Sequence, residues 1–339
     1  MNVTYYFGAG ASCNALPIIN QIPNRITDLV NYLKNEGSLH LSESEPLKKI
    51  TIEQNQRSVQ VKMYDDLNWL AAETKKHASV DTLAKKLFIK KRYEDLKRLK
   101  IALSVFFILE QAKNKPDPRY DAFYASLLND SIISLPKNVK IISWNYDYQF
   151  ELAFSGYTEN TELLTNQTFL NVVQKRDNDS EVNDIFGIYK LNGTTSLYQP
   201  MLFHHFQYLS NLNTNISKKM LESIIENYAN AIFREDVSPT LSFAWEKENT
   251  EKNIITKTIS ATKNTEILVV IGYSFPFFNR EVDKAIIHGM NSLKKVYFQA
   301  PHPHADSIKE RFQSINVNLK SSDLIIKNDV EQFLIPFEL

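Results

Sequence analysis

The first twelve residues join a buried-strand pattern directly to a glycine turn. Residues 3–7 (VTYYF) are mainly β-branched or aromatic, and residues 8–12 (GAGAS) follow without a spacer. This order is typical of the first strand of a parallel α/β sheet and the tight turn after it. Two glycines let the backbone approach a ligand closely, and the following N–H groups, with a helix N-terminus, can face a diphosphate. The segment favours a nucleotide-binding loop, but it lacks the third glycine of the dinucleotide fingerprint G-x-G-x-x-G.

Three later apolar segments have the same form, because each ends in small or polar residues. They are residues 139–145 (VKIISWN), 185–195 (IFGIYKLNGTT) and 267–274 (ILVVIGYS). In an open parallel sheet, ligands bind outside the carboxyl ends of the strands. We therefore expect the residues at these four strand ends to line one crevice.

The alternation of apolar strands with amphipathic helices predicts the fold class. We expect a doubly wound, mostly parallel, Rossmann-like α/β sheet formed by residues 1–34 and 135–339, interrupted by a mainly helical insertion at 35–134. Residues 155–183 are interpreted as a mixed region with a surface loop, and a long helix is expected within residues 200–235.

Together these segments resemble the SIR2 superfamily, specifically the bacterial SIR2-like proteins of antiphage defence. They occur in the family order over residues 7–283. The matching segments are Gly8-Ala9-Gly10-Ala11-Ser12 for GAG-x-S, Asn145-Tyr146-Asp147 for N-(I/Y)-D, Lys190-Leu191-Asn192-Gly193-Thr194 for KLHG(S/T), and Ile271-Gly272-Tyr273-Ser274-Phe275 with Asp283 for IGYSF…D.

The resemblance implies an NAD⁺ hydrolase that releases nicotinamide and ADP-ribose, with NAD as substrate and no metal. It implies catalytic roles for Asn145, Asp147 and Asn192. The implied NAD-binding residues are Gly8, Ala9, Gly10, Ala11, Ser12, Gly193, Gly272, Tyr273, Ser274 and Asp283. The residues also allow structural interpretations, because Asn145 can cap a helix and Asp147 or Asp283 can occupy a first helical turn.

Two departures from the family pattern matter. Asn192 stands where the family has its catalytic histidine, and an amide cannot act as a general base. The interpretations left open are a slow or tightly controlled hydrolase, an enzyme that recruits another base such as His204 or His205, a protein that binds a nucleotide without cleaving it, and an inactivating substitution at Asn192. The single cysteine, Cys13, cannot form the four-ligand zinc ribbon of the deacylase branch.

Composition restricts the partners. The chain has 39 basic and 39 acidic residues, so nothing in the charge balance favours nucleic-acid binding. No apolar stretch is long enough to span a bilayer, and one cysteine suits a reducing cytosol, so a cytoplasmic protein is expected. No segment resembles a separate sensor. We therefore expect a sensor or activator subunit and a homo- or hetero-oligomer. The alternatives are a catalytically inactive NAD- or nucleotide-binding regulatory subunit and, less favoured, an NAD-dependent protein deacylase.

Overall fold

The chain forms two compact units in the computed structural model. The sheet unit comprises Met1–Cys13, Pro116–Gly193 and Phe243–Leu339, and the helical unit comprises Asn14–Lys115 and Thr194–Ser242. The residues described by the structure are 1–47, 54–129, 131–132, 134–174, 185–199, 204–207, 215–243, 245–246, 253–315 and 319–339.

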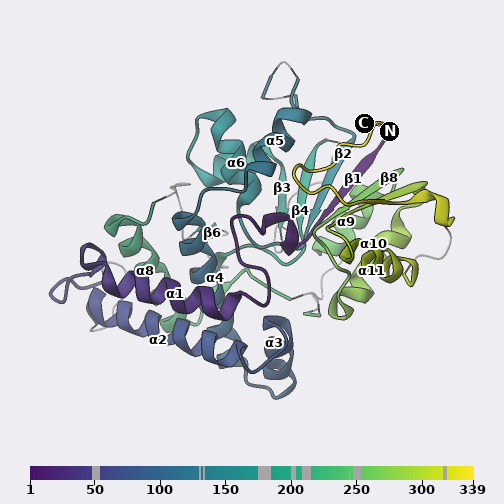
Figure 1. Ribbon diagram of the computed structural model, residues 1–339. Coiled ribbons are helices and arrows are strands. Elements are labelled where there is room, and N and C mark those ends of the chain that lie inside the picture. Colours follow the sequence, from purple (N-terminus) through teal and green to yellow (C-terminus); the bar gives the residue numbers. More distant parts are fainter. Residues whose placement is uncertain are drawn as a thin grey trace. The chain divides into compact units, whose positions relative to one another are not determined.

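A seven-stranded, all-parallel sheet forms the centre of the sheet unit (Figure 1). In sheet order its strands are β10 (Leu324–Lys327), β9 (Lys295–Gln299), β8 (Ile267–Ile271), β1 (Val3–Phe7), β2 (Val139–Ser143), β4 (Gly187–Lys190) and β3 (Val172–Gln174). All five residues of β1, β2 and β8 are buried, as expected for parallel strands covered on both faces.

Helices cover both faces of this sheet (Figure 1). The helices of the sheet unit are α5 (Pro118–Leu127), α6 (Gln149–Thr158), α7 (Leu163–Phe169), α9 (Ile254–Thr262), α10 (Arg280–Gly289) and α11 (His304–Gln313). Because side chains alternate along a strand, Tyr5 of β1 packs in the core with α5 and α6, whereas Tyr6 packs in the core with α9, α10 and α11. The predicted doubly wound, Rossmann-like fold is therefore confirmed.

The order of the strands places β1 at the topological switch point. From β1 the sheet continues on one side to β2 and on the other side to β8, which comes much later in the chain. The carboxyl ends of these three strands are where an α/β sheet of this kind ordinarily binds a ligand.

The helical unit contains the helices expected between residues 35 and 134, apart from α5. Its helices are α1 (Ile22–Asn35), α2 (Gln56–Thr74), α3 (Val80–Ile89), α4 (Tyr93–Lys113) and α8 (Lys218–Phe233). It also contains a small antiparallel sheet that the sequence did not predict. Its strands, in sheet order, are β6 (His204–Gln207), β5 (Ser196–Gln199) and β7 (Ser238–Pro239).

The compact units overlap the predicted domains without coinciding with them. Helix α1 packs against α2 and clusters with the helical unit, whereas α5 packs against α6 and clusters with the sheet unit. The mixed region at residues 155–183 contains α7 and β3, and its polar run at 175–183, interpreted as a surface loop, lies outside the described residues. Within the described residues, no helix is both long and apolar enough to cross a membrane.

Candidate functional site

The turns after β1 and β8 pack backbone against backbone. The amide of Gly8 donates to the carbonyl oxygen of Ile271 at 3.0 Å, and the amide of Gly10 donates to that of Gly272, also at 3.0 Å. A Cβ atom on Gly8 would lie 2.7 Å from the Gly272 carbonyl oxygen, and one on Gly272 would lie 2.2 Å from the Ala11 nitrogen. Gly272 also has a φ of +61°. Close packing between the two turns therefore requires these glycines, whether or not a ligand binds.

The same contacts affect the predicted diphosphate loop. The amides of Gly8, Gly10 and Ala11 already have acceptors, because Ala11 donates to the Gly8 carbonyl oxygen at 2.9 Å. The residues after the turn form a short 3₁₀ helix, η1 (Ala9–Ser12), and the first α-helix starts only at Ile22. The residues directly after the glycines therefore provide no α-helix N-terminus for a diphosphate. Ala9 remains exposed, and Gly10 is partly exposed.

Three of the predicted site residues meet at the ends of β1 and β2. Asn145 Nδ2 donates to the carbonyl oxygen of Gly8 at 3.0 Å and to Ser12 Oγ at 3.3 Å. Ser12 Oγ in turn donates to Asp147 Oδ2 at 2.9 Å. The side chains of Ser12, Asn145 and Asp147 are all buried. Residues from the first two motifs thus form one hydrogen-bonded network.

The carboxyl group of Asp147 binds its proton more tightly in the folded protein than it would when exposed to water. Burial raises the pKa of its carboxyl group, whereas the charge of Lys190 and the hydrogen bond from Ser12 act in the opposite direction. Its second oxygen accepts a bond from the Gln149 amide at 3.3 Å, at the start of α6. Asp147 therefore lies before α6 rather than in its first turn, and its carboxylate bonds both Ser12 and the first amide of that helix.

A buried ion pair lies beside Asp147. Lys190 Nζ, at the end of β4, is 2.7 Å from Glu151 Oε1 and donates to the Asp147 carbonyl oxygen at 2.5 Å. Both charged side chains are at most 1% exposed. Sequence reasoning placed Lys190 in a motif but missed Glu151, because a glutamate in an amphipathic helix usually faces solvent.

The side-chain nitrogen of Asn192 is hydrogen-bonded to the backbone just after β2, whereas its side-chain oxygen has no such bond within the described part of the chain. Its Nδ2 donates to the Trp144 carbonyl oxygen at 2.8 Å, and its Oδ1 is buried with no hydrogen-bond partner among the described residues. Gly193, which follows it, has a φ of +69°, in the left-handed region that glycine adopts readily. An unpaired buried carbonyl oxygen is costly, and a hydroxyl or N–H of a ligand would satisfy it. The side chains of His204 and His205 lie outside the described part of the structure.

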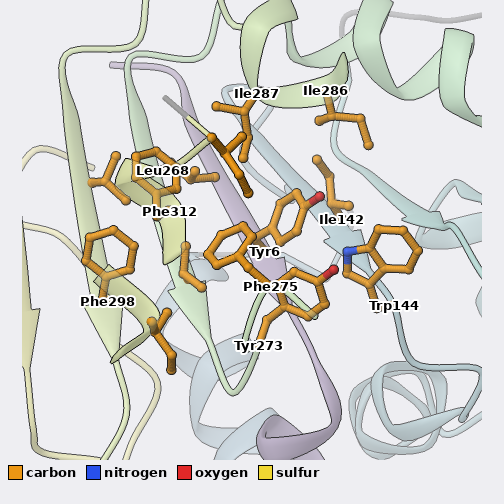
Figure 2. Packing of buried hydrophobic residues seen from close by; sticks show 14 of the residues in the cluster. Tyr6, Ile142, Trp144, Leu268, Tyr273, Phe275, Ile286, Ile287, Phe298 and Phe312 are labelled. Carbon is orange, nitrogen blue, oxygen red and sulfur yellow. The ribbon is translucent and has the colours of Figure 1, made fainter. Parts of the chain in front are cut away.

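Asp283 is enclosed by tyrosines on the opposite side of the sheet from α5. Its carboxylate accepts bonds from Tyr6 Oη at 2.6 Å and Tyr273 Oη at 2.9 Å, and it is fully buried. Figure 2 shows these two hydroxyl groups beside the indole of Trp144, which stacks on Tyr273 with ring centroids 5.6 Å apart. Burial raises the pKa of Asp283 to about 7. In this arrangement the tyrosines, rather than solvent, face the carboxylate.

The remaining predicted residue, Ser274, is exposed, and its carbonyl oxygen accepts a bond from Arg311 Nη1 at 2.9 Å. The structure thus joins the first two motifs directly and links Asn192 to them through Trp144. It places Tyr273 and Asp283 in a separate hydrogen-bonded cluster.

Sequence reasoning also missed two residues of α5 that contact the GAGAS turn. Arg119 Nη2 donates to the Ala11 carbonyl oxygen at 2.9 Å, and Tyr120 Oη lies 2.8 Å from Ser12 Oγ. The only local signal was the sequence Asp117-Pro118, which marks a helix start but does not indicate what the next side chains contact.

No protein-family model matches the chain, and no curated protein sequence matches it. Within the described residues, no group of three or more His, Cys, Asp or Glu side chains is arranged to hold a metal ion.

Proposed function

We propose that this chain binds NAD⁺ at the carboxyl ends of β1, β2 and β8 and hydrolyses it to nicotinamide and ADP-ribose. The observation that carries the proposal is the position of Asn145, whose amide is bonded to both the Gly8 carbonyl oxygen and Ser12 Oγ. Two motifs that the family resemblance singled out are thereby joined at the switch point of a Rossmann-like sheet.

The proposed reaction breaks the bond between C1′ of the ribose and the nicotinamide nitrogen. The bonding electrons leave with neutral nicotinamide, water adds to C1′, and one proton is released. Because the leaving group is already cationic in NAD⁺, its departure needs no general acid. The residues have to bind the ribose, orient water and stabilise an oxocarbenium-like transition state.

The polar atoms at these strand ends fit only part of this task. Both hydrogens of the Asn145 amide are used within the protein, which leaves its Oδ1 to accept from a ribose hydroxyl or from water. The unpartnered Oδ1 of Asn192 is a second acceptor. The amides of Gly8, Gly10 and Ala11 fit a diphosphate poorly, since each already donates to a carbonyl oxygen.

The biological role that follows is that of a cytoplasmic effector in bacterial antiphage defence, in which NAD⁺ depletion aborts infection. A sensor or activator subunit, or assembly into an oligomer, would switch such an effector on. This part of the proposal rests on the resemblance of residues 7–283 to SIR2-like defence proteins.

The main alternative is an NAD-binding regulatory subunit without activity. Asn192 favours it, because an amide in place of histidine removes the family's general base. A protein deacylase is less favoured, because a single cysteine cannot form a four-ligand zinc ribbon.

Calorimetric titration with NAD⁺ and a fluorescence assay of etheno-NAD⁺ cleavage separate these functions. Both should be run on the chain alone and with the protein encoded beside it. We expect saturable binding and release of nicotinamide. Binding without release would favour the regulatory subunit, and absence of binding would refute the proposal. Transfer of the acetyl group from an acetyl-lysine peptide to ADP-ribose, with release of nicotinamide and free lysine, would favour the NAD-dependent deacylase.

A further inference from the structure

The hydroxyl group of Ser12 is the node of the network at the ends of β1 and β2. It carries one hydrogen and two lone pairs, and its hydrogen is donated to Asp147 Oδ2 at 2.9 Å. The Asn145 amide donates to one lone pair at 3.3 Å. The remaining lone pair must accept from Tyr120 Oη, which lies 2.8 Å away. With the Asp147 carboxylate ionised, Ser12 thus donates to Asp147 and accepts from both Asn145 and Tyr120.

Tyr120 is suited to act as a permanent donor in this network. It is fully buried in α5, and burial raises the pKa of its hydroxyl well above the ordinary value, so it stays protonated near neutral pH. Its ring is fixed by edge-to-face contacts with Phe150 and Phe333, with centroids 4.7 Å and 5.0 Å away.

The neighbouring Arg119 fixes the backbone of the same turn. Its guanidinium donates to the Ala11 carbonyl oxygen and pairs with Asp117 Oδ2 at 2.6 Å. The start of α5 thus contacts the GAGAS turn at two points. Arg119 bonds the backbone of the turn, and Tyr120 bonds the Ser12 side chain.

We propose that Tyr120 is a positioning residue, whose hydroxyl orients Ser12 and through it sets the hydrogen bonds of Asn145 and Asp147. Tyr120 does not itself contact substrate. Its effect on turnover rests on the proposed NAD⁺ hydrolysis, whereas its effect on the two side chains does not.

The test compares Tyr120→Phe with Tyr124→Phe. Tyr124 lies one turn further along α5 and is equally buried, but its hydroxyl has no hydrogen-bond partner among the described residues. Without the Tyr120 hydroxyl, Ser12 is a weaker donor to Asp147, so the pKa of Asp147 should rise further. Displacing Asn145 should lower kcat about tenfold, with KM for etheno-NAD⁺ changed less than about twofold. Tyr124→Phe should alter none of these quantities.

Two readouts do not need activity. In protein labelled with ¹⁵N-asparagine, the side-chain amide signal of Asn145 is assigned from its absence in Asn145→Ala. In protein labelled with ¹³C-aspartate, the titration of Asp147 is assigned with Asp147→Asn. Tyr120→Phe should shift the side-chain amide signal of Asn145 and move the midpoint of the Asp147 titration to higher pH. If both stay as in the parent, the positioning role is refuted, even where the parent proves unable to bind NAD⁺.

A double-mutant cycle with Ser12→Ala tests whether Tyr120 acts on Asn145 through Ser12. If Tyr120 acts through Ser12, adding Tyr120→Phe to Ser12→Ala should change the Asn145 signal no further, and kcat should fall no further. An additional fall equal to that of Tyr120→Phe alone would show that Tyr120 acts by another path and would overturn the inference.

Discussion

Ser12 Oγ lies 2.9 Å from Asp147 Oδ2, although 135 positions separate the two residues in the chain. The parallel pairing of β1 with β2 brings them together, because Phe7 is in register with Ser143 and the Trp144 amide donates to the Phe7 carbonyl oxygen. Each residue follows its strand within five positions, so both reach the same edge of the sheet. The contact therefore depends on correct register between the two central strands.

Because the turns after β1 and β8 pack closely on each other, adding one methyl group at Gly272 should strongly destabilise the fold. Gly272→Ala would place a side chain in the left-handed region and a Cβ atom 2.2 Å from the Ala11 nitrogen. We expect a loss of about 2–5 kcal/mol in the free energy of unfolding. Gly156→Ala is the control, because nothing lies within 4 Å of its added Cβ and it lies in α6. That change should be neutral or stabilise by up to about 1 kcal/mol. Urea denaturation measures the free energy of unfolding of both variants, and equal values would contradict a specific packing requirement at Gly272.

The buried pair of Lys190 and Glu151 predicts a second stability difference. Glu151→Gln leaves the Lys190 ammonium buried without its counter-charge, which should cost about 3–5 kcal/mol. Asp236→Asn removes one member of the Arg234–Asp236 pair, whose side chains are 39% and 35% exposed, and should cost less than about 1 kcal/mol. Equal losses in urea denaturation would contradict the assignment of Lys190–Glu151 as a buried pair.

Asp283 predicts a pH-dependent difference in thermal stability. The pKa of the folded carboxyl is about 7, whereas an unfolded aspartate has a pKa of about 3.9. The folded state therefore binds this proton more tightly, and the contribution of Asp283 to stability is lost as pH rises through the folded pKa. Asp283→Asn lacks this loss. The Tm of the variant minus that of the parent should increase between about pH 5 and about pH 8, and a constant difference over that interval would exclude the raised pKa.

The fold could be predicted because its signal is local. The runs at β1, β2 and β8 are apolar over consecutive residues, as buried parallel strands require, and each ends in residues that favour turns. Strand β3 is only three residues long, and no run of that length stands out from a loop in the sequence.

The candidate site was only partly predictable for a different reason. Asn145 and Asp147 directly follow a strand, so their place at the sheet edge follows from the strand itself. Tyr120 reaches Ser12 from a helix 108 positions away, and no sequence pattern reveals which buried tyrosine has a partner for its hydroxyl. The glycines were interpreted as ligand contacts, whereas their close packing on each other becomes visible only when β1 and β8 are neighbours.

The proposed hydrolysis is tested most directly by comparing the cleavage of etheno-NAD⁺ by Asn145→Ala, Asn192→His and the parent, each with any activating partner present. Asn291→Ala, at an exposed position after α10, is the matched control. Asn145→Ala should abolish turnover without unfolding the protein, because it removes the amide that joins the two motifs. Asn192→His should preserve or raise turnover, because histidine can accept a proton near neutral pH. Asn291→Ala should match the parent. An Asn145→Ala protein as active as the parent would contradict the catalytic assignment.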